Sequence, residues 1–155
     1  MRSQPGSAPA RPATGWVEHT RRVLADAGHP STGPRGAIVE VLGRQDCVLT
    51  AREIVDALRA EGREVGIATV YRALERLARL GLVQRLDVGE GFARYEPADP
   101  GGEHHHHLVC DSCGQVSPFE DEQLERAIGR VAGRLDYTVA AHDVVLRGRC
   151  PACAA

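Results

Sequence analysis

Two Cys-x-x-Cys pairs constrain this 155-residue chain more than any other feature of its sequence. Cys110 and Cys113 form the first pair, Cys150 and Cys153 form the second, and 36 residues separate the two pairs. A chain without a secretory signal is expected in a reducing compartment, where such pairs are more often metal ligands than disulfides. Four thiolates complete the tetrahedral shell of Zn²⁺ and leave no position open for a substrate. We therefore expect a structural zinc site that joins the end of the chain to its middle.

Length and composition limit the protein to one or two small domains. Hydrophobic residues make up 43% of the chain and charged residues 26%, a balance that is typical of soluble globular proteins. No apolar run approaches the roughly 18 residues that a membrane span needs. Residues 1–15 are rich in Pro, Ala, Ser and Gly and contain no apolar segment of a signal peptide, so we expect a disordered tail. These features predict a cytoplasmic protein without a membrane partner.

Charge divides the chain into two parts of opposite sign. Residues 1–86 contain 13 arginines and 9 acidic residues, whereas residues 87–155 contain 6 arginines and 12 acidic residues. A basic part can meet a polyanion, while an acidic part avoids it and can hold cations. A segment rich in Pro and Gly at residues 97–103 has the composition of a hinge. We therefore expect one domain over residues 16–96 and a second over residues 104–155.

Helical periodicity and helix-end signals recur in the first domain. The apolar spacing predicts four helices, over residues 16–27, 34–43, 50–62 and 68–80. Thr50 is the expected N-cap of the third helix, and Glu53 completes a capping box with it. Residues 82–86 and 92–96 predict two strands about the turn at residues 88–91, which is a β-hairpin. Helices followed by a hairpin are typical of a winged helix-turn-helix, whose last helix enters the DNA major groove.

The last of these helices carries a stripe of arginines. Arg72, Arg76 and Arg79 recur at i, i+4 and i+7, and Tyr71 stands beside Arg72 at the start of the helix. Arginine can bind phosphate or guanine, and tyrosine can stack on a base or touch a thymine methyl group. The alternative is an ordinary solvated helix face, on which Glu75 pairs with Arg79. Tyr71 beside Arg72 favours DNA binding.

Four consecutive histidines, His104 to His107, lead into the first Cys pair. In an extended strand alternate residues face opposite sides, so His104 and His106 point one way while His105 and His107 point the other. One strand can then supply ligands to two separate metal sites. An exposed histidine cluster without a metal is the alternative.

Taken together, these motifs resemble the ferric uptake regulator family, the metal-responsive bacterial repressors that include iron, zinc, manganese and peroxide sensors. The resemblance runs from about residue 16 to 153, and its matching segments are Pro34-Arg35, Gly66 to Leu74, His104 to Cys110, Cys113-Gly114 and Cys150 to Cys153. It implies an α+β fold, with an N-terminal winged helix-turn-helix domain and a small α/β dimerisation domain that holds the four-cysteine zinc site. It also implies a metal-loaded homodimer that binds double-stranded operator DNA, and a protein that is not an enzyme.

The resemblance assigns DNA-binding roles to particular residues. Tyr71 and Arg72 match the residues that read bases and backbone in the family, and Arg35 matches a phosphate contact of the second helix. Thr69 and Arg76, on the same helix as Tyr71, complete the expected DNA-binding set.

The resemblance further implies a metal site inside the second domain, in addition to the four cysteines. Its four ligands are expected to be His104, His106, Glu125 and His142. We expect Glu125 on a helix over residues 121–135 and His142 in a strand over residues 138–147.

A regulatory metal site between the domains is implied as well. His105 and His107 match two of its ligands, and Glu96 matches a hinge ligand of the iron sensors. The sequence departs from the family here, because Cys47-Val48 replaces a family His and the hinge Cys of the zinc sensors is absent. Cys47 and Asp87 are candidate further ligands, and His29 is a weaker one. A small buried core residue is the alternative for Cys47.

The ligand types favour zinc as the sensed metal. Zinc prefers four N, S and O ligands, whereas Fe²⁺ and Mn²⁺ prefer five or six ligands with more oxygen. The histidine run contains no Asp, and Pro118 stands where iron and peroxide sensors often have a carboxylate. We therefore expect structural Zn²⁺ and a regulatory Zn²⁺ that controls metal uptake genes. Regulatory Fe²⁺ in an iron-sensing regulator, or a peroxide sensor, is the alternative; a metal buffer or a zinc hydrolase is more remote.

Overall fold

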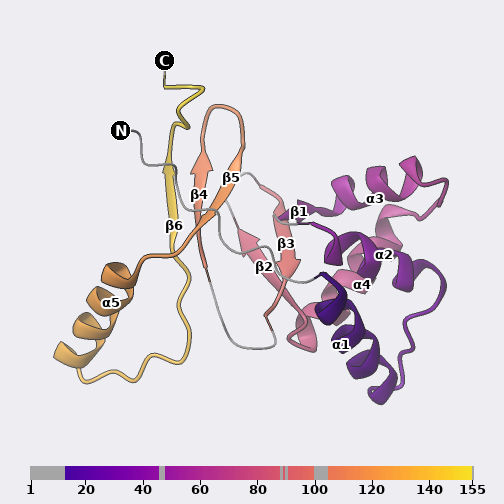
Figure 1. The fold of residues 1–155 in the computed structure, drawn as a ribbon, viewed down its shortest axis with the longest axis horizontal. Coiled ribbons are helices and arrows are strands. Elements are labelled where there is room, and N and C mark those ends of the chain that lie inside the picture. Colours follow the sequence, from indigo (N-terminus) through magenta and orange to yellow (C-terminus); the bar gives the residue numbers. More distant parts are fainter. Residues whose placement is uncertain (1–12, 46–47, 88, 90, 100–104, 155) are drawn as a thin grey trace. The chain divides into compact units, whose positions relative to one another are not determined.

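The fold consists of two compact units that divide between Glu103 and His104, at the end of the predicted hinge. The computed structural model describes residues 13–45, 48–87, 89, 91–99 and 105–154. The first unit combines four described helices, and the second unit one, with a three-stranded sheet, which confirms the expected α+β class (Figure 1). Among the described residues, no helix has the length and apolar character to span a membrane.

The core of the first unit is formed by four helices, which are α1 (Ala13–Asp26), α2 (Gly33–Gly43), α3 (Ala51–Ala60) and α4 (Ile67–Arg79). Their apolar faces turn inward, and the fully buried side chains include Leu24, Ile38, Ile54, Leu58 and Leu74. The predicted capping box begins α3: the Thr50 side chain accepts from the backbone N–H of Glu53 at 3.1 Å, and the Glu53 carboxylate accepts from Thr50 N–H at 2.7 Å. The number and order of these helices agree with the prediction.

The start of α1 corrects the expected tail. The helix begins at Ala13, so residues 13–15 are helical and not part of a disordered segment; residues 1–12 lie outside the described residues. Trp16 is buried, and its indole N–H donates to the backbone oxygen of Leu82 at 3.0 Å. The helix thus begins three residues before Trp16, the residue at which the sequence pattern placed its start.

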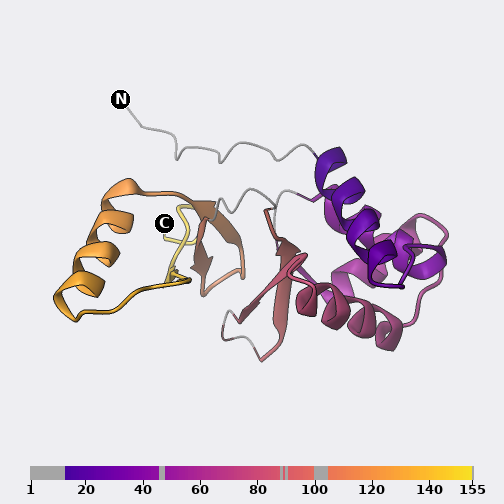
Figure 2. The same ribbon diagram turned by 90° about the horizontal axis from the view of Figure 1, so that it is seen from below.

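The predicted hairpin is present and belongs to a small antiparallel sheet. Its strands are β1 (Leu49–Thr50), β2 (Val83–Asp87) and β3 (Ala93–Pro97), in the order β1-β3-β2. Figure 2 shows the β2–β3 hairpin beside the helices of its unit. Pro97, expected in the hinge, ends β3 opposite Val83. Proline is tolerated at this strand end because only the interior of a ladder requires its missing N–H.

The second unit contains β4 (His106–Cys110), β5 (Val116–Phe119), α5 (Glu122–Arg134) and β6 (Val145–Gly148). The strand order is β5-β4-β6, with β4 antiparallel to β5 and parallel to β6. The predicted helix is present, and the Asp121 side chain caps it by accepting from the backbone N–H groups of Gln123 and Leu124 at 2.8 and 2.9 Å.

The strand expected over residues 138–147 is shorter than predicted. Only Val145–Gly148 is extended and paired, and His142 lies in the irregular segment before it. The reason is the length of its partner, because β4 begins at His106 and His107 already pairs with Val145. Within the part of the chain that the structure describes, no strand lies beside residues 138–143 to continue the ladder.

Candidate functional site

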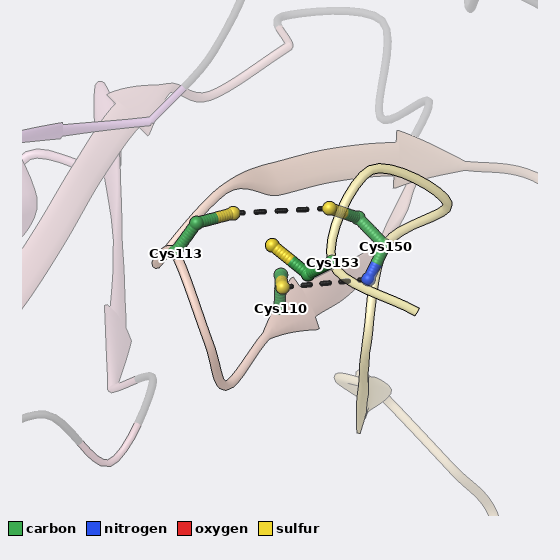
Figure 3. Close-up of side chains that lie close together, drawn as sticks. All are labelled: Cys110, Cys113, Cys150 and Cys153. Atoms are coloured by element: carbon green, nitrogen blue, oxygen red, sulfur yellow. Dashed lines mark hydrogen bonds between the residues drawn. The ribbon is translucent and has the colours of Figure 1, made fainter. Parts of the chain in front are cut away.

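The two Cys-x-x-Cys pairs meet in the second unit (Figure 3). Cys110 ends β4, and the parallel pairing of β4 with β6 brings Cys150 and Cys153 beside it. The sulfur atoms of all four cysteines lie within 4.8 Å of one another, and those of Cys113 and Cys150 are 3.8 Å apart. Four sulfurs at about 2.3 Å from a tetrahedral Zn²⁺ lie about 3.8 Å from one another. The donor set and its spacing therefore fit zinc.

Hydrogen bonds make the four thiols unequal. The backbone N–H of Cys150 donates to the Cys110 sulfur at 3.3 Å, and this bond, with one from the backbone of Cys113, lowers the pKa of Cys110 to about 6. Hydrogen bonds with the side chains of Cys150 and Cys113 raise the pKa of Cys153 to about 12. Sulfurs this close can all ionise only when a cation neutralises them. The cluster thus has the electrostatics of a cation site.

A second cluster of metal ligands lies in the same unit. The Nε2 atom of His106 on β4 is 2.6 Å from Glu125 Oε1 on α5, and Nε2 of His142 is 3.1 Å from Glu125 Oε2. The ligand atoms of these three residues lie within 4.8 Å of one another, and His106 is only 2% exposed. Imidazole and carboxylate together suit Zn²⁺, Fe²⁺ and Mn²⁺. His104, the expected fourth ligand, lies outside the described residues.

The other two histidines of the run lie close to each other. The rings of His105 and His107 are in edge contact, with their centroids 4.8 Å apart. His106 and His107 are consecutive residues of β4, so the side chain of His107 points to the face of the sheet opposite that of His106. Glu96 is buried in β3 of the first unit. A metal shared by Glu96, His105 and His107 stays a prediction.

Of the further candidate ligands, His29 contacts Arg76 of α4, which leaves Asp87 and Cys47. Asp87 ends β2, and its carboxylate accepts from the backbone N–H of Gly89 at 2.9 Å. This bond gives Asp87 a structural role at the hairpin turn, where Gly89 has a positive φ of 73°. Cys47 lies outside the described residues, so its role as a ligand or core residue stays open.

The exposed face of α4 carries the predicted DNA-binding residues. Val70, Ala73, Leu74 and Leu77 form the buried face. Arg72 is exposed, and Thr69 and Arg76, three residues before and four residues after it, are half-buried on the same side of the helix. The Arg72 guanidinium donates to the Thr69 hydroxyl at 3.1 Å, and Tyr71 is 45% exposed. These side chains are therefore accessible to a partner.

The stripe is not uniform, because Arg79 pairs with Glu75 at 3.9 Å on the solvated surface. Arg35, in the first turn of α2, donates to the backbone oxygen of Pro30 at 3.1 Å, and Arg76 contacts the imidazole of His29. Sequence reasoning missed the place of His29 beside α4, since 47 residues separate it from Arg76 and no local pattern links them. This contact is visible only in the fold.

Comparison with known proteins identifies the family. The chain matches the model of the ferric uptake regulator family over residues 26–147. The ferric uptake regulation protein of Legionella pneumophila is 37% identical over 131 residues, which cover 84% of this chain and 95% of that protein. The Vibrio cholerae ferric uptake regulator superimposes with a TM-score of 0.76 at 35% identity, over 84% of this chain and 98% of that one. The Helicobacter pylori ferric uptake regulator, whose structure is described as revealing three functional metal binding sites, has a TM-score of 0.82 at 26% identity, over 94% and 96% of the two chains. The chain therefore belongs to the ferric uptake regulator family of metal-responsive transcription regulators, and it is not an enzyme.

Proposed function

We propose that the protein is a metal-dependent repressor that binds double-stranded operator DNA as a homodimer in the cytoplasm. The observation that carries this proposal is the division of labour between the two units. The first unit presents Tyr71, Arg72 and Arg76 on an accessible helix. The second unit holds the cluster of four cysteines and the cluster of His106, Glu125 and His142. One unit is thus suited to DNA and the other to metal.

The exposed face of α4 has the chemistry of a recognition helix. In a winged helix this element lies in the major groove, where an arginine can donate two hydrogen bonds to guanine and a tyrosine can contact a thymine methyl group. Arg72 and Tyr71 are suited to these roles, and Thr69 holds Arg72 through a hydrogen bond at 3.1 Å. Arg35 and Arg76 are suited to the phosphates that fix the register of the helix.

An uncovered apolar surface supports dimerisation through the second unit. None of the α5 residues is buried in the single chain, and Val131 and Leu135 on or beside it are 45% and 64% exposed. Leu108 and Leu146, paired across β4 and β6, are 45% and 47% exposed. Figure 2 shows no other described element of the unit over the outer side of α5. A second copy related by twofold symmetry would cover these side chains.

The three predicted metal sites would divide structural from regulatory work. Four thiolates at Cys110, Cys113, Cys150 and Cys153 would hold a structural Zn²⁺ that stabilises the second unit. His105, His107 and Glu96 belong to different units, so their joint ligation of one ion would restrict the hinge between them. This restriction would raise the population of dimers whose two recognition helices match successive major grooves.

Zinc is the sensed metal that we propose, and the ligand types support it. The side chains that cluster from the histidine run are imidazoles, which suit the small coordination number of Zn²⁺. Fe²⁺ is a second candidate, because the Legionella relative is named a ferric uptake regulation protein. Affinity alone does not separate these metals, since Zn²⁺ binds most such sites more tightly than Fe²⁺.

Operator binding against buffered free metal tests the proposal. A duplex would be selected from a random pool with the zinc-loaded protein, and binding would be followed by fluorescence anisotropy at rising free Zn²⁺ and, anaerobically, at rising free Fe²⁺. We expect DNA affinity to rise with free Zn²⁺ over the concentrations at which a regulatory site takes up the metal. A response to Fe²⁺ alone would assign iron as the sensed metal, and DNA binding that ignores both metals would contradict the repressor proposal.

A further inference from the structure

Three basic side chains from separate elements gather beside the exposed face of α4. His29 lies in the loop after α1, and its Nε2 contacts the Arg76 guanidinium. Arg35 comes from α2 and donates to the oxygen of Pro30, the residue after His29. Thr69 and Arg76 share one face of α4, so His29 stands next to the helix face proposed for DNA.

The backbone fixes the position of His29. Gly28 has a φ of 75°, a conformation that favours glycine, and the chain turns back sharply there. The backbone N–H of His29 then donates to the oxygen of Leu24 at 2.7 Å, which ties the loop to the end of α1. The imidazole is therefore held beside α4 by the fold and does not reach it through a flexible loop.

The surroundings of His29 favour its neutral form. Desolvation, then the positive charges of Arg76 on α4 and Arg35 on α2, lower the pKa of this imidazole. Neutral His29 accepts the hydrogen bond from Arg76 at Nε2. A further positive charge here is unfavourable until an anion arrives to balance it.

We propose that His29, Arg35 and Arg76 form one binding site for a backbone phosphate of DNA, and that operator binding adds a proton to His29. The inference rests on the proposed DNA-binding function and extends it to proton linkage. A phosphate between the three side chains offsets their mutual repulsion and accepts a hydrogen bond from the imidazolium. Phosphate contacts of this kind set the position of the protein on DNA without reading its sequence.

The test measures operator affinity from pH 8 to pH 6 at constant ionic strength and saturating metal. His29→Gln keeps an oxygen that can accept from Arg76 but cannot take up a proton. His19→Gln, on α1, makes the same change at another histidine of the unit and is the matched control. We expect the affinity ratio of wild type to His29→Gln to rise as pH falls, by up to about tenfold for each unit by which DNA raises the pKa of His29. The His19→Gln protein should follow the wild type.

Loss of bound metal at low pH would weaken DNA binding by the wild type and by His29→Gln alike, so it cancels in the ratio of their affinities. The metal content of each protein is measured at each pH. A second measurement follows the His29 ring protons by NMR, and we expect them to titrate at higher pH in the DNA complex. Parallel pH profiles for wild type and His29→Gln, with no shift of the His29 resonance, would overturn the proton linkage while DNA binding itself stands. Absence of DNA binding by all three proteins at every pH would overturn the proposed function and this inference together.

Discussion

At the scale of single residues, each of the four cysteines is expected to be necessary for the stability of the second unit. The cluster of four cysteines joins β4 to the segment after β6, and zinc ligation of this kind can contribute on the order of 10 kcal/mol to folding. We expect Cys113→Ser to lose the tightly bound zinc and the cooperative unfolding of this unit. Zinc content by mass spectrometry and thermal unfolding by circular dichroism measure both effects. Ser112→Ala, in the same turn, is the control; a zinc-replete, normally stable Cys113→Ser protein would refute the assignment.

The unequal thiols predict how zinc binding depends on pH. The pKa of Cys110 is lowered to about 6, so its thiolate and the hydrogen bonds to it are present at pH 7.5 and are lost as pH falls through 6. Cys113 and Cys153 have raised pKa values and keep their protons over this range. Zinc binding at the four cysteines of the metal-free protein should therefore release about one more proton at pH 5.5 than at pH 7.5. Calorimetry in buffers of different ionisation enthalpy counts these protons, and an unchanged number would contradict the assignment to Cys110.

At the scale of elements, α4 is expected to bind DNA through Arg72, whereas Arg79 on the same helix is expected to contribute little. Arg72→Ala should cost about 1 to 3 kcal/mol of specific binding if the guanidinium makes a bidentate base contact. Arg79→Ala is the matched control, because Arg79 faces solvent and pairs with Glu75 at 3.9 Å. Anisotropy titrations with operator and with unrelated duplex measure the loss of specificity. Equal losses for the two variants would show that only overall charge matters.

The elements also show which features of the fold are local in the sequence. The starts of α3 and α5 could be predicted because Thr50 with Glu53 and Asp121 make their capping bonds within three residues. β1 could not be predicted, since its two residues are extended only because they pair with β3. The limits of β6 depend in the same way on β4, a strand far from it in the sequence. These strand boundaries are set by pairing between distant segments, and no local sequence pattern predicts that pairing.

The residues of the candidate site also divide into those that the sequence predicts and those that depend on how distant segments pack. The four cysteines could be predicted as one site, because a metal imposes their convergence wherever the chain folds between them. The contact of His29 with Arg76 could not, because it depends on how the loop after α1 packs against α4. The segment that carries His142 was predicted as a strand, yet His142 still reaches Glu125 from an irregular segment.

At the scale of the whole molecule, the exposed apolar surface of the second unit predicts a dimer, which a charged side chain introduced into that surface should weaken. Leu146 is 47% exposed in the single chain, so Leu146→Glu should leave the fold of each chain intact. Buried against a second copy, two unpaired carboxylates should weaken the dimer at least about tenfold. Ala60→Glu adds the same charge to an exposed position of the first unit and should stay dimeric. Sedimentation over a concentration series measures both, and an equally stable Leu146→Glu dimer would place the interface elsewhere.

The proposed metal response belongs to the whole molecule, because the proposed regulatory ligands Glu96, His105 and His107 come from both units. Alternation along β4 separates His106 from the contacting pair His105 and His107. Replacing His105 and His107 together by Ala should leave a folded, zinc-containing dimer whose operator affinity no longer changes with free metal, since the link between units is lost. Replacing His106 and His142 together should instead lower the thermal stability of the second unit, because their cluster with Glu125 lies within it.

Both double variants would be compared by light scattering, thermal unfolding and operator binding across buffered free Zn²⁺. If the His105 and His107 variant still responds to metal as the wild type does, the regulatory site does not use these residues. If the two variants lose stability and response alike, the histidines serve one site and the separation by strand alternation has no functional meaning. Distinct losses, one of response and one of stability, are what two sites on opposite faces of a single strand require.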